Sequence, residues 1–329
     1  MQEDSRVERY DLTYTMLQQE DGLPAGACRD RMALAIGFFD GVHRGHAEVI
    51  RQAVLAAKER GFAPAVLTFS PHPRSVLGKD GFDTVLTPLE DKLALFAELG
   101  VELAYVVTFD LGFAGVTADD FVRRLLLPLG VRTAVVGFDF RFGHRGQGDA
   151  EAMRRLSDGE IEVRVVEPVF EGDAKVSSTR IRERLAEGDC EAVTLLLGRP
   201  YAISGEIVHG DARGRLLGFP TANMKPAVPY VIPRHGVYAV TVGGVPGEAR
   251  ERGGVINVGV RPTFDAPGGA PRLETNLFDF EGDLYGRTLT VRFHRFLRPE
   301  TKFASFDDLK AQIAKDADHA RSTLRELGL

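Results

Sequence analysis

The sequence predicts two domains of different class, an α/β domain over residues 1–187 followed by an antiparallel β domain with a C-terminal helix over residues 188–329. In the first part, short apolar runs alternate with helical patterns, which is typical of a doubly wound parallel sheet. In the second part, short β-branched runs follow one another with frequent Gly and Pro between them. A chain of 329 residues with 44% hydrophobic residues is long enough for both cores.

The α/β domain is expected to contain five strands, joined by helices. The expected strands are apolar runs at residues 32–39, 63–69, 101–109, 133–138 and 161–169. Helices are expected at 43–61, from Thr87 onward, and at 118–129, and the segment Thr87-Pro88-Leu89-Glu90 has the pattern of a capping box with Pro at the first helical position. Because helical crossovers join parallel strands, we expect a Rossmann-like sheet covered on both faces.

The second domain is expected to be a barrel or a sandwich closed by one helix. Its strands are expected at residues 201–208, 236–243, 253–259, 274–280 and 289–297. Ser305 is the expected N-cap of the last helix, with Asp308 three residues on. The expected apolar stripe of that helix consists of Leu309, Ile313, Ala317, Ala320 and Leu324.

Composition excludes several classes of protein. The net charge of −6 does not fit a general nucleic-acid binder. Cys28 and Cys190 are scattered, so neither a zinc site nor a disulfide framework is expected, and a reducing cytoplasm is the expected location. No apolar run reaches the length of a membrane span, and the charged first residues do not read as a signal peptide. The pattern leaves the oligomeric state open.

The segment 37–46, GFFDGVHRGH, joins an expected strand to an expected helix through a glycine-containing turn. His43 and His46 are three residues apart and therefore share one face of the first helical turn. That turn carries free N–H groups and a partial positive charge, and Gly45 would let a phosphate approach the backbone closely. Two imidazoles there can donate hydrogen bonds to a phosphoryl group, which suits phosphoryl-type transfer.

This segment is similar to the HxGH motif of the nucleotidyltransferase superfamily, in the form carried by bacterial FAD synthetases. Three further segments resemble that family in order: TFSPHPRSVL (68–77), VGFDFRFGHRGQGD (136–149) and VSSTRIR (176–182). Phe38 is a departure, because the family more often has a smaller or polar residue there.

The resemblance implies adenylyl transfer from ATP to FMN, which yields FAD and pyrophosphate. His43 and His46 would stabilise the transition state, while His72 and Pro73 would border the flavin. The resemblance also implies the residues that bind ATP. They are Gly37, Phe38, Asp40, Gly45, Asp139, Ser178, Thr179 and Arg180. Among them, Asp139 would contact the adenosine, and residues 178–180 would hold the leaving phosphates.

A second motif lies at residues 209–223, where glycines and arginines precede Thr221 and Asn223. In an extended segment those two side chains point to the same side. A hydroxyl and a carboxamide oxygen are hard ligands that suit Mg²⁺ bridging nucleotide phosphates, and glycines let backbone N–H groups approach an anion. No GxxxxGK[ST] motif occurs, so a P-loop is not expected.

GRLLGFPTAN (214–223) is similar to the PTAN motif of riboflavin kinases, a barrel domain, and GVYAV (236–240), NVGVRPTF (257–264) and LETNLFDF (273–280) match later segments of that family. By this resemblance Thr221 and Asn223 bind Mg²⁺–ATP and Glu274 is the general base toward riboflavin. The resemblance adds Gly210, Gly214, Arg215, Gly218 and Pro220 on the ATP side, and Asn257 and Arg261 on a flavin or nucleotide flap. Asn276 stands where the family often has His, a departure that bears on a hydrogen bond to the neighbouring strand.

The resulting hypothesis is a cytoplasmic bifunctional enzyme that makes FMN from riboflavin in its barrel and FAD from FMN in its α/β domain, with ATP and Mg²⁺. Small molecules are its expected partners, without nucleic acid or membrane. One alternative keeps the HxGH chemistry with another acceptor and an accessory flavin-binding barrel. A second alternative is a flavin-binding or regulatory module without catalysis, against which the set of intact site residues argues.

Overall fold

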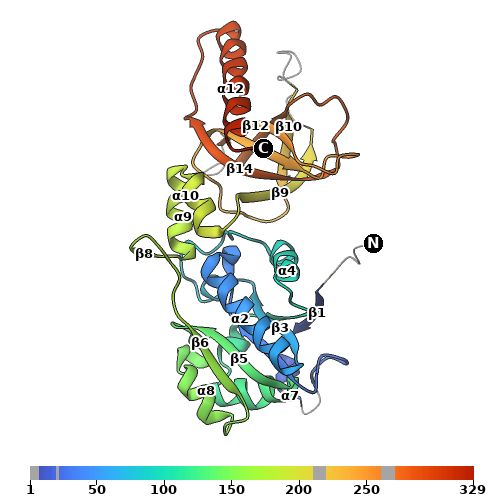
Figure 1. Ribbon diagram of the computed structural model, residues 1–329, viewed down its shortest axis with the longest axis vertical. Helices are drawn as coiled ribbons and strands as arrows, with labels where there is room; N and C mark the ends of the chain where they lie inside the picture. Colours follow the sequence, from blue (N-terminus) through green and yellow to red (C-terminus); the bar gives the residue numbers. More distant parts are fainter. Residues whose placement is uncertain (1–6, 20–21, 210–219, 261–270) are drawn as a thin grey trace. The chain divides into compact units, whose positions relative to one another are not determined.

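The computed structural model describes residues 7–19, 22–209, 220–260 and 271–329. The chain divides into two compact units, Met1–Ser178 (unit 1) and Thr179–Leu329 (unit 2), whose elements are labelled in Figure 1. The sequence analysis set the domain boundary after residue 187, which is the other end of helix α9 (Ser178–Glu187).

Unit 1 is built on a six-stranded parallel sheet in the order β1-β4-β3-β2-β5-β6, as the alternating pattern predicted. The strands are β1 (Glu8–Leu12), β2 (Met32–Ile36), β3 (Ala63–Ser70), β4 (Leu103–Thr108), β5 (Val131–Gly137) and β6 (Glu162–Val166). The edge strand β1 was missed, because its sequence ERYDL is charged and mostly exposed. A short hairpin, β7 (Phe170–Glu171) and β8 (Ala174–Lys175), follows the sheet.

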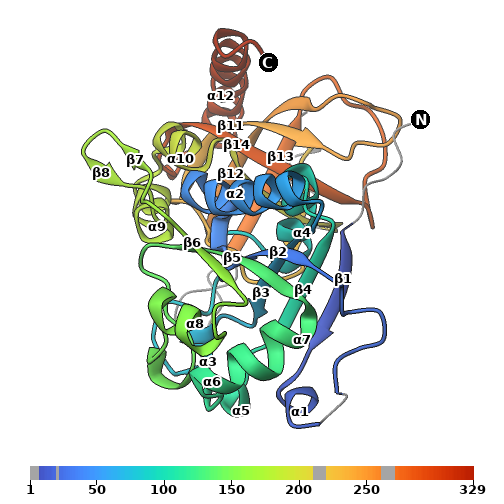
Figure 2. The ribbon, with the colours of Figure 1, turned by 60° about the horizontal axis from the view of Figure 1, so that its bottom comes forward.

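Helices cover both faces of this sheet, as Figure 2 shows. They are α1 (Tyr14–Leu17), α2 (Arg44–Arg60), α3 (Pro73–Val76), α4 (Leu89–Glu98), α5 (Leu111–Ala114), α6 (Ala118–Asp120), the π-helical turn η2 (Phe121–Leu126), α7 (Leu127–Leu129) and α8 (Ala150–Leu156), with 3₁₀ turns η1 (Asp40–Val42) and η3 (His144–Gly146). Successive strand residues face opposite layers: Val66 packs with α2 and α4, and Leu67 with the layer of η2 and α7.

The predicted capping box at the start of α4 is wrong. Pro88 is the N-cap, no side chain caps the helix, and helical geometry begins at Leu89. The backbone N–H of Thr87 is bound instead by the carboxylate of Asp40, 3.2 Å away. A tertiary contact therefore replaces the local cap that the sequence pattern predicted.

Unit 2 contains a closed antiparallel barrel in the order β10-β13-β12-β11-β14-β9. Its strands are β9 (Tyr201–Val208), β10 (Ala222–Pro226), β11 (Gly236–Gly243), β12 (Arg252–Val260), β13 (Pro271–Leu277) and β14 (Thr288–Arg298), and its helices are α9, α10 (Cys190–Leu197) and α12 (Phe306–Glu326). The short strand β10 was not among the expected strands. The predicted N-cap of α12 is confirmed, since Ser305 Oγ accepts from the Asp308 N–H at 3.1 Å.

Helix α12 packs on the outer face of the barrel. Its residues Ala317, Ala320 and Leu324 form one cluster with Val237 and Ala239 of β11. Because side chains alternate along a strand, Tyr238 between them faces the barrel interior and is fully buried. The same alternation determines which side chains of the neighbouring strands lie on the outer face of the barrel.

Candidate active sites

The turn that follows β2 has an unusual backbone. Phe39, Gly41 and Val42 have φ values of 56°, 84° and 40°, in the left-handed region. A bulky residue and a β-branched residue rarely adopt this conformation, which persists only where surrounding contacts impose it. Gly37 makes room for the turn, because a Cβ there would lie 2.9 Å from the buried Phe39 ring.

His43 and His46 meet at the start of α2, as predicted. His43 is the N-cap, and its Nδ1 accepts a hydrogen bond from the backbone N–H of His46 at 3.2 Å. The two rings stack with their centroids 3.6 Å apart. Gly45 keeps this stack open, since a Cβ there would lie 3.2 Å from the His43 ring. Because Nδ1 accepts, a neutral His43 carries its proton on Nε2, where it can be donated to a ligand.

The environment of His46 favours the neutral imidazole. Burial, and then the charges of His43, Lys92 and Lys175, lower the pKa of His46 well below its ordinary value. Its buried Nδ1 has no hydrogen-bond partner in the part of the chain that the structure describes. His46 is therefore uncharged at neutral pH, and its ring forms a hydrogen bond to the backbone of Asp40.

Asp40, predicted on the ATP side, points into the protein. Its side chain is 3% exposed, and Oδ1 accepts from the backbone N–H groups of Leu86 at 2.8 Å and Thr87 at 3.2 Å. Its carbonyl oxygen accepts from the hydroxyl of Ser178 at 2.9 Å. Asp40 thus joins the turn to the start of α4. Ser178, another predicted residue and the last residue of unit 1, binds the backbone of the same turn.

Lys92 is a residue of this site that the sequence analysis missed. It lies on α4 and is 3% exposed, and its Nζ donates to the carbonyl oxygen of Phe38 at 3.0 Å. Nζ also lies 3.4 Å from Thr68 Oγ1 and 4.2 Å from the centroid of the Phe38 ring. Burial lowers the pKa of Lys92 to about 8. The available signal was its position four residues before the buried Phe96, on the apolar side of the helix.

The structure brings Phe38 and His72 together, although the resemblance placed them on different substrates. Their ring centroids are 4.0 Å apart, and the His72 ring lies 4.6 Å from that of Phe82. His72 is the N-cap of α3, where Nδ1 accepts from the Arg74 N–H at 3.0 Å, and Pro73 occupies the first turn. The aromatic Phe38 therefore lines the same side of the turn as the His72 loop.

Asp139 lies after β5 and forms an ion pair with Lys175 of β8, with 3.0 Å between Oδ2 and Nζ. The Lys175 ammonium also lies 4.0 Å from the centroid of the Phe138 ring. The hairpin β7–β8 is tied to α2 as well, through an ion pair between Glu171 and Arg44. Thr179 and Arg180, predicted at the leaving phosphates, lie in the first turn of α9 and belong to unit 2.

In unit 2, three predicted residues form one row across neighbouring strands. Asn223 of β10 lies directly opposite Glu274 of β13, which in turn lies opposite Asn257 of β12. The row continues to Val237, which packs against α12, so these side chains are on the outer face of the barrel. Thr221, two residues before Asn223, is half-buried at the start of the same segment.

Polar contacts fix this row. Arg272 donates to Glu274 Oε1 at 2.6 Å, and Asn257 Nδ2 donates to Glu300 Oε1 at 3.2 Å. Asn276, on the same side of β13 as Glu274, donates to the carbonyl oxygen of Pro220 at 2.8 Å. Asn276 thus forms a hydrogen bond to the segment that leads into β10.

A cavity of about 990 Å³ lies beside Asn276 and Pro220. Its wall also includes Phe278, Arg252 and Arg321, so both aromatic and charged surface face it. The predicted residues Gly210, Gly214, Arg215, Gly218 and Arg261 lie outside the described residues.

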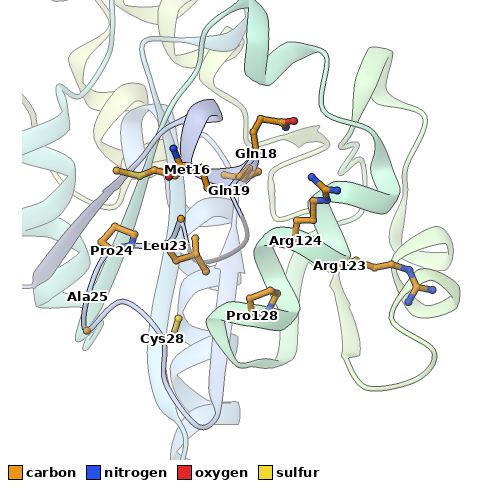
Figure 3. Close-up of a pocket in the computed structure, with 13 residues that line it drawn as sticks. Met16, Gln18, Gln19, Leu23, Pro24, Ala25, Cys28, Arg123, Arg124 and Pro128 are labelled. Atoms are coloured by element: carbon orange, nitrogen blue, oxygen red, sulfur yellow. The ribbon is translucent and has the colours of Figure 1, made fainter.

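A second cavity, of about 660 Å³, lies in unit 1 between residues 16–19 and 22–28 on one side and η2 on the other (Figure 3). Arg123 and Arg124 project beside it, and each is ion-paired with carboxylates, Arg124 with Asp120 at 3.1 Å. Among the described residues that line it there is none that the sequence analysis assigned to a site.

Comparisons with known proteins cover both units. Residues 26–180 match the family model described as FAD synthetase, and residues 197–324 match the one described as riboflavin kinase. The protein named bifunctional riboflavin kinase/FMN adenylyltransferase of Bacillus subtilis is 42% identical over 88% of this chain and 92% of its own length. The Escherichia coli protein of the same name is 41% identical over 90% and 93%.

A solved structure from Streptococcus pneumoniae, titled as a macrolide-efflux protein, covers 95% of this chain and 99% of its own, with 32% identity and a TM-score of 0.83. Within the described residues of the present chain, no helix has both the length and the apolarity to cross a bilayer. The two family models follow each other in the order of the two units, and the identity to the curated relatives extends through both. The chain belongs to the family of bifunctional riboflavin kinase/FMN adenylyltransferases.

Proposed function

We propose that this chain converts riboflavin to FMN in unit 2 and FMN to FAD in unit 1, with ATP as the donor in both reactions. The observation that carries the proposal is the pair of stacked imidazoles at the N-terminus of α2, in a chain that matches both families in order. The first reaction transfers the γ-phosphoryl group and releases ADP. The second transfers the adenylyl group and releases pyrophosphate.

In the adenylyl transfer, a phosphate oxygen of FMN attacks the α-phosphorus of ATP, and the bond to the β-phosphate oxygen breaks. His43 donates a hydrogen bond from Nε2 to the oxygens on which charge develops, and by the resemblance the neutral His46 also stabilises them, at the N-terminal turn of α2. By the resemblance, the leaving pyrophosphate binds the segment 178–180, where the Arg180 guanidinium supplies several donors in one plane.

The remaining predicted residues of unit 1 orient the two substrates. Asp139 contacts the adenosine half, and its ion pair with Lys175 makes it part of a charged rim. His72 and Pro73 border the flavin, and the contact between His72 and Phe38 extends that border with a second aromatic ring. Gly37 and Gly45 lie on the proposed ATP side. A Cβ at either position would crowd the ring of Phe39 or His43 and so disturb the turn that faces the nucleotide.

In the kinase reaction, Glu274 accepts the proton of a ribityl hydroxyl as that oxygen attacks the γ-phosphorus of ATP. Arg272 holds the carboxylate of Glu274 in place. Pro220, with Gly210, Gly214, Arg215 and Gly218, completes the ATP side by the resemblance. The cavity lined by Asn276, Phe278 and Phe280 is the proposed place of the flavin, because Asn276 lies two residues from Glu274 on the same face of β13.

Mg²⁺ fits the same row of residues. Asn223 lies directly opposite Glu274 in the strand register, and Thr221 is two residues before Asn223, so side chains with hard oxygen atoms occupy neighbouring positions. Thr221 and Asn223 would hold the ion together with the ATP phosphates. When bound, Mg²⁺ neutralises charge on the phosphates.

A product assay tests both activities. Purified protein is incubated with ATP and Mg²⁺, with riboflavin in one sample and FMN in another, and the flavins are separated by chromatography. FMN and FAD from riboflavin, with FAD from FMN, are the expected products. FAD from FMN alone would reduce the barrel to a flavin-binding accessory, and absence of both products would refute the flavin assignment.

A further inference from the structure

Lys92 carries a charge that the scheme above does not use. It is 3% exposed, and its amine contacts neutral groups: the Phe38 carbonyl oxygen, the Thr68 hydroxyl and the Phe38 ring. Asp40 is a negative charge in its surroundings. Burying an ammonium among neutral groups is unfavourable. A buried charge of this kind is typical of functional sites.

The amine binds the backbone directly before the active-site turn (residues 39–42). Lys92 Nζ and Thr68 Oγ1 both donate to the carbonyl oxygen of Phe38, each at 3.0 Å. The left-handed residues Phe39 and Val42 follow at once, and the turn ends at His43. Lys92 therefore helps to hold the strained segment that sets the direction of the His43 and His46 rings.

We propose that Lys92 is a positioning residue for adenylyl transfer, which fixes the turn before His43 and adds a positive charge at neutral pH behind the nucleotide phosphates. This inference rests on the proposed function of unit 1. The charge also opposes protonation of His46, on which it acts through space. The residue works through the turn and the local potential, without touching the reacting atoms.

The substitution Lys92→Met tests this role, because it keeps the length of the side chain and removes the charge. Its matched control is Lys58→Met, at an exposed lysine near the other end of α2. We expect kcat/KM for FAD formation from FMN at neutral pH to fall about 10- to 100-fold in Lys92→Met, the size of effect that misplacement of catalytic groups produces. FMN formation by the same preparation should stay within about twofold of wild type, which serves as the control for protein amount and for the folding of unit 2.

The two possible failures are distinguishable. Wild-type protein that makes no FAD from FMN would refute the proposed function of unit 1. Wild-type protein that makes FAD, with Lys92→Met equally active at neutral pH, would refute the role of Lys92 alone.

The pH dependence separates a charge effect from a packing effect. Since the pKa of Lys92 is about 8, wild type loses this charge as the pH rises above that value. The ratio of wild-type to Lys92→Met activity should therefore fall toward one by about pH 10. The other titratable groups near Lys92 are Asp40, His43, His46, His72 and Lys175, and all are present in both proteins. The pKa of His46 lies well below its ordinary value, so His46 stays neutral in this pH range and its coupling to Lys92 adds no pH dependence. A large ratio that stays constant with pH would overturn the proposal.

Lys92→Arg extends the test to the case in which Lys92→Met loses both activities through misfolding. Arginine stays charged throughout the range. FAD formation by Lys92→Arg should then be level between about pH 7 and 10, where wild type declines. A decline parallel to that of wild type would overturn the proposal.

Discussion

Replacing Lys92 by methionine should stabilise unit 1 even though it impairs adenylyl transfer. In the folded protein the pKa of Lys92 is about 8, against an ordinary value of 10.5, because burial disfavours the charged amine. At about 1.4 kcal/mol for each pH unit, this difference corresponds to about 3 kcal/mol of lost stability at neutral pH. The variant also loses one hydrogen bond to Phe38, about 1 kcal/mol, so a net gain of about 2 kcal/mol is expected.

The sign of the pH dependence follows from the same comparison. Between about pH 8 and 10.5 the unfolded chain binds the Lys92 proton and the folded chain does not, so the stability of wild type rises with pH in this window. The advantage of Lys92→Met should shrink accordingly, from about 2 kcal/mol at pH 7 to less than about 0.5 kcal/mol at pH 9.5. Other titrating groups are common to both proteins and cancel in the difference.

The assay must resolve the two units, because a two-unit chain need not unfold in one step. Pulse proteolysis in increasing urea, with the surviving fragments identified by mass, reports the unfolding of unit 1 by itself. The control Lys58→Met should match wild type at both pH values, since its side chain is exposed. A Lys92→Met protein that is less stable than wild type at pH 7, or whose stability difference does not change with pH, would refute the reasoning.

Three further predictions concern other residues of the two units. His43→Ala should lower FAD formation about 100- to 1000-fold and spare FMN formation. Glu274→Ala should lower FMN formation about 100- to 10,000-fold and spare FAD formation from supplied FMN. Equal loss of both activities in either variant would contradict the two-site scheme. Gly45→Ala should reduce FAD formation about tenfold in the same product assay, because its Cβ would lie 3.2 Å from the His43 ring; wild-type activity would show that the ring stack tolerates the methyl group. Burial raises the pKa of Cys190 to about 12 while Cys28 is exposed, so a thiol reagent at about pH 8 should modify one cysteine per folded chain, Cys28, by mass spectrometry; labelling of Cys190 at a similar rate would contradict its burial.

Strong local patterns predicted most of the fold. The strands β9 and β11 lie at the predicted residues 201–208 and 236–243, where an apolar, β-branched pattern is continuous. Besides the short hairpin β7–β8, the strands β1 and β10 were missed. Each is five residues long and carries charged or polar side chains; β1 lies at the edge of its sheet, and β10 overlaps the PTAN segment. Their identity as strands depends on pairing with β4 and β13, which no local pattern reports.

The candidate sites divide in the same way. His43 and His46 lie close together in sequence, so helical spacing alone predicted their shared face. The roles of Asp40 and Lys92 depend on partners far along the chain, since Asp40 binds the N–H groups of Leu86 and Thr87, and Lys92 binds the carbonyl of Phe38. A sequence pattern indicates which residue types are present, and the fold decides which distant groups they meet.

The active-site turn shows why these distant contacts matter. Left-handed conformations at Phe39 and Val42 are each unfavourable by about 1–3 kcal/mol, so the segment would not adopt this shape from local preference. Contacts from four separate segments oppose that strain: Lys92 and Thr68 bind the carbonyl before the turn, the 86–87 backbone binds the carboxylate of Asp40, and Ser178 binds its carbonyl. The buried charge of Lys92 and the left-handed turn are both unfavourable in free energy. Their common result is the fixed position of His43 and His46. Stability is reduced at the place where the geometry of phosphate contacts must be fixed before the substrates bind.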